Sequence, residues 1–136
     1  MVNPKGYGLK AFDLGSHGNV EPLTISNPDG LNLTAYAVRG PKEQFVTLIN
    51  KEHGPGAREA KVALVIAGNL RQAEVIYLAA PAGDVAAKTG VTLGGAAINA
   101  DSPWLGKWTR LPATQSGPYT VKAPAGAAAI VRISTQ

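Results

Sequence analysis

Cysteine is absent from this chain of 136 residues. Disulfide bonds, thiolate metal sites and a cysteine nucleophile are therefore excluded. No stretch approaches the ~20 apolar residues of a membrane-spanning helix, and the first residues lack the apolar core of a signal peptide. We expect residues 1–6 to be a linker that precedes the folded part. The chain is then either a small cytoplasmic protein or a piece of a larger one.

Charged residues are scarce, at 16% of the chain, and neither sign dominates. Thirteen basic residues against nine acidic ones give a net charge of +4. Opposite charges stand side by side, as at Lys42 and Glu43 or at Arg58 and Glu59. Nucleic-acid-binding proteins instead concentrate Lys and Arg on one stripe. This scatter is typical of a solvated surface and predicts no nucleic-acid partner.

Glycine and proline, by contrast, are abundant and divide the chain into short segments. There are 16 glycines and 10 prolines, and 45% of the residues are hydrophobic. Turn residues every ~8–12 positions favour a sandwich or a barrel over helices. We expect residues 7–136 to form a single all-β domain. Its architecture is predicted to be an antiparallel two-sheet β-sandwich, Greek-key-like, with about eight or nine strands.

Alternating apolar and polar residues place the expected strands. They cover residues 20–26, 31–39, 44–51, 61–67, 73–79, 108–111, 119–123 and 128–133, with a hairpin-like pair over 90–100. We expect 31–39 to pair antiparallel with 44–51. The run 61–67 is almost continuously apolar, which indicates a strand covered on both faces. Pro22 cannot donate to a ladder, so its strand is expected at an edge or a bulge.

Two segments are ambiguous. Residues 7–14 alternate as a strand would, but they also fit the end of a helix. Residues 84–89 could form one helical turn. Periodicity cannot decide between these readings in segments this short.

The acidic residues give no sign of a catalytic pair. Acid–base catalysis by a carboxyl pair needs two carboxyl groups close together, one of them with a raised pKa. Most of the acids here fall in expected turns or beside a basic residue, and Glu74 is expected to point outward from its strand. We therefore predict no catalytic residue. The nine acids are Asp13, Glu21, Asp29, Glu43, Glu52, Glu59, Glu74, Asp84 and Asp101.

Metal and cofactor signatures are also missing. His17 and His53 lie in separate glycine-rich loops, whereas a metal site needs clustered ligands. The sequence has no Gly-x-Ser-x-Gly nucleophile elbow. Its glycine pairs lack the spacing of phosphate-binding loops. We predict no metal and no cofactor.

Residues 101–110 are the strongest candidate for ligand contact. This segment holds Trp104 and Trp108 together with Asp101, Lys107 and Arg110. Sugar rings stack on indoles while polar groups bind their hydroxyls. Alternation would place both Trp side chains on one face of a strand. The other reading is that they fill the core or cover an interface with another domain.

Three segments in their order and spacing resemble a known family. They are residues 33–51, 90–96 and 119–133, which read LTAYAV…FVTLINK, GVTLGGA and YTVKAPAGAAAIVRI. They are similar to the C-terminal β-domain of glycoside hydrolase family 79, which includes heparanase and bacterial β-glucuronidases. Residues 7–12 resemble the join between that family's barrel and its β-domain. The similarity runs over about residues 7–133.

The resemblance implies an accessory domain and not an enzyme in its own right. In this family a (β/α)8 barrel carries both catalytic glutamates, and such a barrel needs ~250 residues. The expected partner is that barrel, absent here, with a uronic-acid-containing glycan as a further candidate. Tyr7, Phe12 and one Trp are the expected interface residues. A carbohydrate-binding module and, third, a stand-alone enzyme are the alternatives.

The resemblance has a consequence for the sheet edges. In related enzymes a strand from before the barrel often joins the sandwich, so this chain would lack one strand. A bare edge invites pairing with another chain. We therefore expect some self-association through an exposed strand edge. A secreted or periplasmic parent protein remains open, with no targeting signal in this chain.

Overall fold

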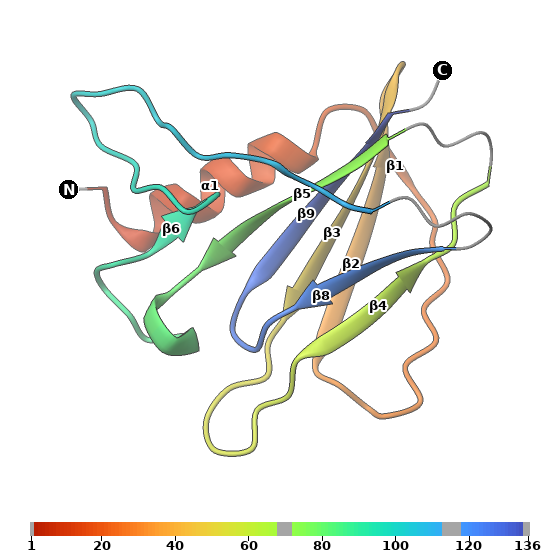
Figure 1. Cartoon of the computed structure of the whole chain (residues 1–136), viewed down its shortest axis with the longest axis horizontal. Coiled ribbons are helices and arrows are strands. Elements are labelled where there is room, and N and C mark those ends of the chain that lie inside the picture. Colours follow the sequence, from red (N-terminus) through yellow and green to blue (C-terminus); the bar gives the residue numbers. More distant parts are fainter. Residues whose placement is uncertain (1, 68–71, 113–117, 135–136) are drawn as a thin grey trace.

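The computed structural model describes residues 2–67, 72–112 and 118–134. One α-helix precedes a series of antiparallel strands (Figure 1). The elements are α1 (Pro4–Gly15), β1 (Asn19–Glu21), β2 (Leu33–Arg39), β3 (Glu43–Asn50), β4 (Ala60–Leu64), β5 (Gln72–Ala79), a 3-10 turn (Pro81–Gly83), β6 (Thr92–Leu93), β7 (Thr109–Arg110), β8 (Tyr119–Ala123) and β9 (Ala128–Ser134).

The described strands form two sheets. The larger has the order β1-β2-β3-β9-β5-β6, with β7 also on β5, and the smaller pairs β4 with β8. Every pairing is antiparallel, and β9 is inserted between β3 and β5. The predicted all-β two-sheet sandwich is confirmed. The expected antiparallel pair of 31–39 with 44–51 is confirmed as β2 and β3.

The main core lies between the two sheets. Alternate residues of the central strands meet in register, as at Val46, Val131 and Val75. The smaller sheet contributes Val121 and Leu64 from the opposite side. Burying these side chains stabilises the fold by ~1.5–3 kcal/mol each before conformational entropy is counted.

The other face of the larger sheet carries α1. Tyr7 and Ala11 of the helix pack against Ile76, Leu93 and Ile130 of the sheet. Figure 1 shows the helix crossing the strands on the side of the sheet away from β4 and β8. The domain therefore has three layers: a two-stranded sheet, the larger sheet and one helix.

Local chemistry explains why residues 4–15 are helical. The Asn3 side chain caps the first turn by accepting a hydrogen bond from the Lys5 N–H at 2.8 Å, and Pro4 stands in that turn. A Cβ on Gly15 would lie 2.8 Å from Thr47 Oγ1, so glycine lets the helix lie close to β3. Of the two readings left open for residues 7–14, the helix is correct. It begins at Pro4, inside the range expected to be a linker.

Several details differ from the sequence expectations. β4 is covered on one face only, so the prediction of a strand covered on both faces is wrong. It belongs to the outermost layer, where Lys61 and Ala63 face solvent and Val65, just beyond it, is 87% exposed. The strand expected over 20–26 ends at Glu21 because Pro22 follows, and it lies at the sheet edge as predicted.

The two segments between β5 and β7 are less regular than expected. Residues 84–89 form no helix; the turn at Pro81–Gly83 precedes them. The hairpin expected over residues 90–100 is reduced to one isolated bridge, between Leu93 and Ala96. No helix among the described residues is long and apolar enough to cross a membrane.

Candidate functional site

Trp104 is held firmly against its own segment. Its indole N–H donates to the Leu93 carbonyl at 3.0 Å. A Cβ on Gly106 would lie 2.0 Å from the ring, so the indole rests directly on the glycine backbone. Lys10 Nζ from α1 lies 5.7 Å from the ring centroid. The half-buried ring thus joins the 94–108 segment to the helix-side core.

Trp108 is half-buried and lies against a charged side chain. The Arg132 guanidinium is 4.2 Å from the ring centroid, within cation–π range. Arg132 Nη2 also donates to Glu74 Oε2 at 2.6 Å, and its Nε lies 3.9 Å from Glu43 Oε1. This chain of contacts ties β3, β9 and β5 to the segment before β7. Glu74 lies on the same side of β5 as Ile76, toward α1 and not toward the inter-sheet core.

The other predicted contact residues are placed apart from one another. Tyr7 is buried, and its hydroxyl accepts a hydrogen bond from the Ile98 N–H at 2.9 Å. Phe12 is 73% exposed on the outer side of α1. Asp101 and Arg110 are exposed, and Arg110 lies opposite Glu74 in register. The structure brings Tyr7, Trp104 and Trp108 to one apolar cluster and leaves Phe12 outside it.

Glu52 and the two histidines interact with residues close to them in sequence. Arg58 donates to the Glu52 carboxylate at 2.8 Å and, with the Asn32 N–H, holds the pKa of Glu52 below its ordinary value. His53 Nδ1 lies 2.9 Å from the Lys51 carbonyl. His17 lies 3.7 Å from Asp13. In the described part of the chain, no three His, Cys, Asp or Glu side chains are grouped to hold a metal ion.

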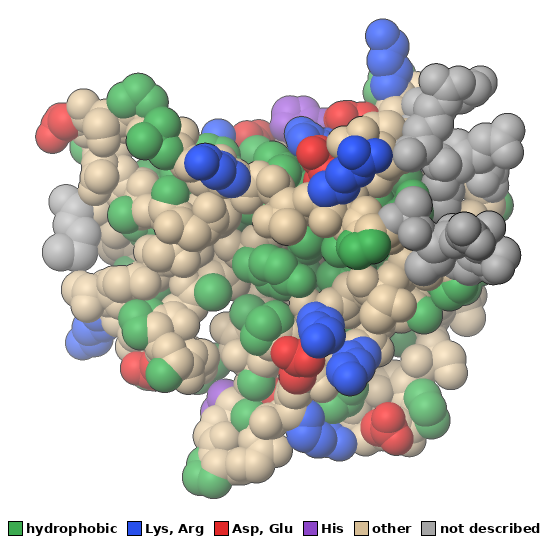
Figure 2. Space-filling view, viewed as in Figure 1, with side chains coloured by type: hydrophobic (Ala, Val, Ile, Leu, Met, Phe, Trp, Pro, Cys, Tyr) green, Lys and Arg blue, Asp and Glu red, His purple; other side chains and the backbone are tan. Residues whose placement is uncertain are grey.

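Charge is mixed on the surface as well. Figure 2 shows basic and acidic side chains interspersed on the face that carries β4 and β8. This distribution agrees with the scattered charges of the sequence and offers no single-sign patch on the visible face.

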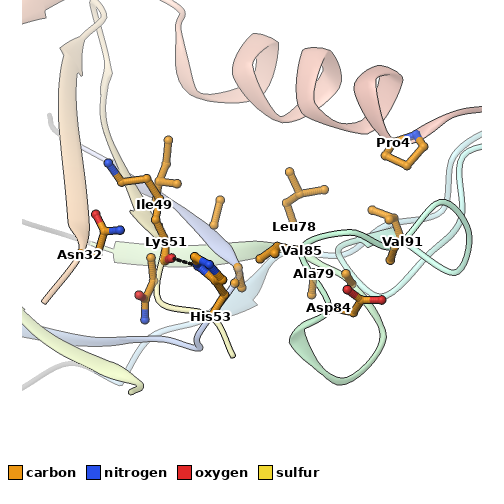
Figure 3. Close-up of a pocket in the computed structure, with 16 residues that line it drawn as sticks. Pro4, Asn32, Ile49, Lys51, His53, Leu78, Ala79, Asp84, Val85 and Val91 are labelled. Carbon is orange, nitrogen blue, oxygen red and sulfur yellow. Dashed lines mark hydrogen bonds between the residues drawn. The ribbon is translucent and has the colours of Figure 1, made fainter. Parts of the chain in front are cut away.

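A groove of about 550 Å3 lies beside the first turn of α1. Its floor is a cross-strand row on the helix side of the sheet, formed by Ile49, Ala128 and Leu78, which are in register. Figure 3 shows Lys51 and His53 at one end and Asp84, Val85 and Val91 at the other. The lining is mainly apolar. Sequence reasoning did not find this groove, although alternation already places Ile49 and Leu78 on the face away from the inter-sheet core.

Two large apolar side chains are exposed on the outer side of α1. Leu9 and Phe12 are three positions apart and are 72% and 73% exposed. Side chains at this spacing lie on one face of a helix. The helix therefore packs an apolar side on the sheet and exposes this apolar pair outward, beside the exposed polar residues Lys5 and Asp13.

Comparison with known proteins gives a fold and no family. No family model and no curated protein sequence matches this chain. Solved structures do match. A glycoside hydrolase family 30 subfamily 8 xylanase from Clostridium acetobutylicum is 13% identical with a TM-score of 0.58, over 97% of this chain and 28% of that one.

Two further structures extend the likeness. A β-porphyranase of glycoside hydrolase family 86 from Bacteroides plebeius is 12% identical with a TM-score of 0.57, over 88% of this chain and 17% of that one. An arabinofuranosidase is 16% identical with a TM-score of 0.52, over 80% of this chain and 20% of that one. This chain thus spans less than a third of each. The likeness shows a fold shared with part of several glycoside hydrolase structures, while membership of family 79 is not shown.

Proposed function

We propose that this chain is a non-catalytic β-sandwich domain of a glycoside hydrolase, which packs on a (β/α)8 catalytic barrel and stabilises it. We further propose that the parent enzyme is a β-glucuronidase or heparanase-like protein of family 79. The shared fold supports the first part, because this chain corresponds to only 17–28% of the xylanase and porphyranase chains. The order of sequence segments supports the second.

The observation that carries the proposal is the exposed apolar pair on α1. The inner side of α1 is used by the sheet, through Tyr7 and Ala11. The outer side leaves Leu9 and Phe12 in solvent, at a cost of ~25 cal/mol for each Å2 of apolar surface. We take this pair as the anchor of the proposed contact, because contiguous exposed apolar patches mark interaction sites. The apolar groove beside Pro4 adjoins the same helix and extends the proposed contact.

The two Trp residues are better explained by packing within the domain. One face of Trp104 lies on Gly106, and Trp108 lies against Arg132. A sugar ring would need an indole face of its own. Glycan binding through Trp104 and Trp108 is therefore treated as the competing outcome of the test below.

The test is association with a separately produced family 79 barrel. We expect this chain to bind the barrel and to raise its melting temperature, because ligands of the folded state stabilise it. The Phe12→Asp variant should weaken binding by about tenfold, since buried aromatic anchors dominate interfaces. The matched control is Val20→Asp, which changes another exposed apolar residue, on β1. It should bind as the unmodified chain does.

Equal loss in both variants, or no association at all, would contradict the proposal. Titration with uronic-acid glycans, followed by Trp fluorescence, examines the competing outcome. A saturable change that is lost in Trp108→Ala would favour a carbohydrate-binding module instead.

A further inference from the structure

The smaller sheet ends in two edges of unequal character. Within the described residues, β4 and β8 pair with each other and with no third strand. A two-stranded sheet is marginal without further support. The β8 edge is partly closed, because the Tyr77 hydroxyl donates to the Lys122 carbonyl at 2.7 Å. The β4 edge is the one to consider.

Two side-chain hydrogen bonds show how the backbone of β8 is oriented. Successive carbonyls in a strand point in opposite directions. The Lys122 carbonyl points away from β4, toward Tyr77, and the Ala123 carbonyl therefore points toward β4. Asn50 agrees with this orientation, since its Nδ2 donates both to Ala123 and to the Arg58 carbonyl just before β4.

The register then fixes the free edge of β4. Lys61 lies opposite Lys122, and Ala63 lies opposite Thr120. Residues opposite one another in a non-hydrogen-bonded pair both point their N–H and C=O outward. Lys61 and Ala63 therefore present their backbone groups to the β4 edge. The backbone hydrogen bonds of the described chain outside the ladders involve neither residue.

Apolar surface accompanies this bare edge. Val62 points inward from β4 but is only half-buried. Leu31, Leu33 and Ala35 pack against the same core and are also only partly buried. A further strand beside β4 would both satisfy the edge and extend cover over this side of the core.

We propose that β4 pairs antiparallel with β4 of a second copy of this chain, joining the two outer sheets into one continuous sheet. In the proposed register, Val62 lies opposite Val62 on the two-fold axis. Lys61 of each copy then exchanges hydrogen bonds with Ala63 of the other. A shift that brings Lys61 opposite Lys61 sets like charges against each other and is disfavoured. The proposal is independent of any catalytic partner.

Single-cysteine variants test the register directly, because the chain has no cysteine of its own. Across the axis, Val62 occupies a non-hydrogen-bonded pair with Cα atoms ~4.5 Å apart, within disulfide range. The Ala63 positions of the two copies are diagonal neighbours ~7–8 Å apart, too far for a bond. We expect Val62→Cys to give a covalent dimer under mild oxidation, about tenfold more than Ala63→Cys. Equal yields, or none from a folded Val62→Cys, would overturn the proposal.

Charge variants at Ala63 give a second test that leaves the core untouched, since this side chain is exposed. In the proposed register, residue 63 of each copy lies opposite Lys61 of the other, so each dimer contains two such pairs. Sedimentation velocity over a concentration series should show the unmodified chain approaching a dimer. Ala63→Glu should lower the dimer Kd, and Ala63→Lys should raise it, by at least about twofold each. A monomer at all concentrations, or the same shift for both variants, would overturn the proposal.

Discussion

Two strands of this domain have nearly continuous apolar sequences and opposite surroundings. β9 lies in the middle of the larger sheet, between β3 and β5. Its Val131 and Ile133 are fully buried in the inter-sheet core, and Ile130 is fully buried under α1. β4 lies in the outer layer, and residues that alternate with its buried Leu64 are in solvent. A run of apolar residues therefore reports that a strand forms, but the layers around it decide how many faces are covered.

Shortening one apolar side chain in β9 and one beside β4 tests the difference in burial between the two strands most strongly. We expect Ile130→Ala to lower the free energy of unfolding by about 2–5 kcal/mol, because it leaves a cavity between β9 and α1. Val65→Ala, beyond β4, should change it by no more than about 0.5 kcal/mol, because Val65 is in solvent. Chemical denaturation of the two variants measures both values. A similar loss in the two would mean that the outer layer is packed as tightly as the central one.

The fold was largely predictable because its strands carry local signals. The expected range 119–123 matches β8, and 73–79 differs from β5 by one residue. Turn residues and alternation depend only on neighbouring residues, so both can be recognised from the sequence. The helix was left ambiguous because its sheet-facing positions include Ala11 and Gly15, which contribute little hydrophobic signal. Those small residues allow the helix to pack closely on β3 and β9. This tertiary contact cannot be read from the local sequence pattern.

The candidate site was less predictable because its contacts join distant segments. The sequence placed Trp104 and Trp108 together, but their surroundings depend on Gly106 and on Arg132 of the last strand. The groove beside α1 is formed by residues from separate parts of the chain, including Ile49 and Leu78. Local alternation shows which residues of a strand share a face. The order of strands in the sheet is also needed to place residues of different strands in one row.

The second largest loss of stability is expected where Asn50 links the two sheets. Asn50 at the end of β3 is buried, and its amide donates to the carbonyls of Arg58 and Ala123 at 2.9 Å each. Its Oδ1 accepts from the Glu52 N–H at 3.0 Å. Asn50→Ala should lower the free energy of unfolding by about 1–3 kcal/mol, because partners buried with it lose their hydrogen bonds.

Asn99→Ala is the matched control for this substitution, since Asn99 is exposed. It should leave the unfolding free energy within about 0.5 kcal/mol of the unmodified chain. Hydrogen exchange locates the effect: β4 and β8 amides should lose protection in Asn50→Ala before those of β9 do. Uniform loss across both sheets would show that Asn50 supports the core as a whole and not the attachment of the outer sheet.

The smallest effect tests the other connection of the outer sheet, at the β8 edge. Tyr77 of β5 donates its hydroxyl hydrogen to Lys122, so Tyr77→Phe should cost about 0.5–1.5 kcal/mol at neutral pH. Burial raises the pKa of Tyr77 above its ordinary value of about 10, and the Glu59 carboxylate adds to the rise. A phenol with a higher pKa in the folded chain favours folding fully below pH ~10, and that advantage is lost as the pH rises toward the folded value. The stability difference between the two proteins should therefore shrink from pH 8 to pH 11 in denaturation curves, because every other titrating group is common to both. A difference that stays constant would show that the Tyr77 hydroxyl is as well solvated in the folded chain as in the unfolded one, and that this edge of β8 is as open as the edge of β4.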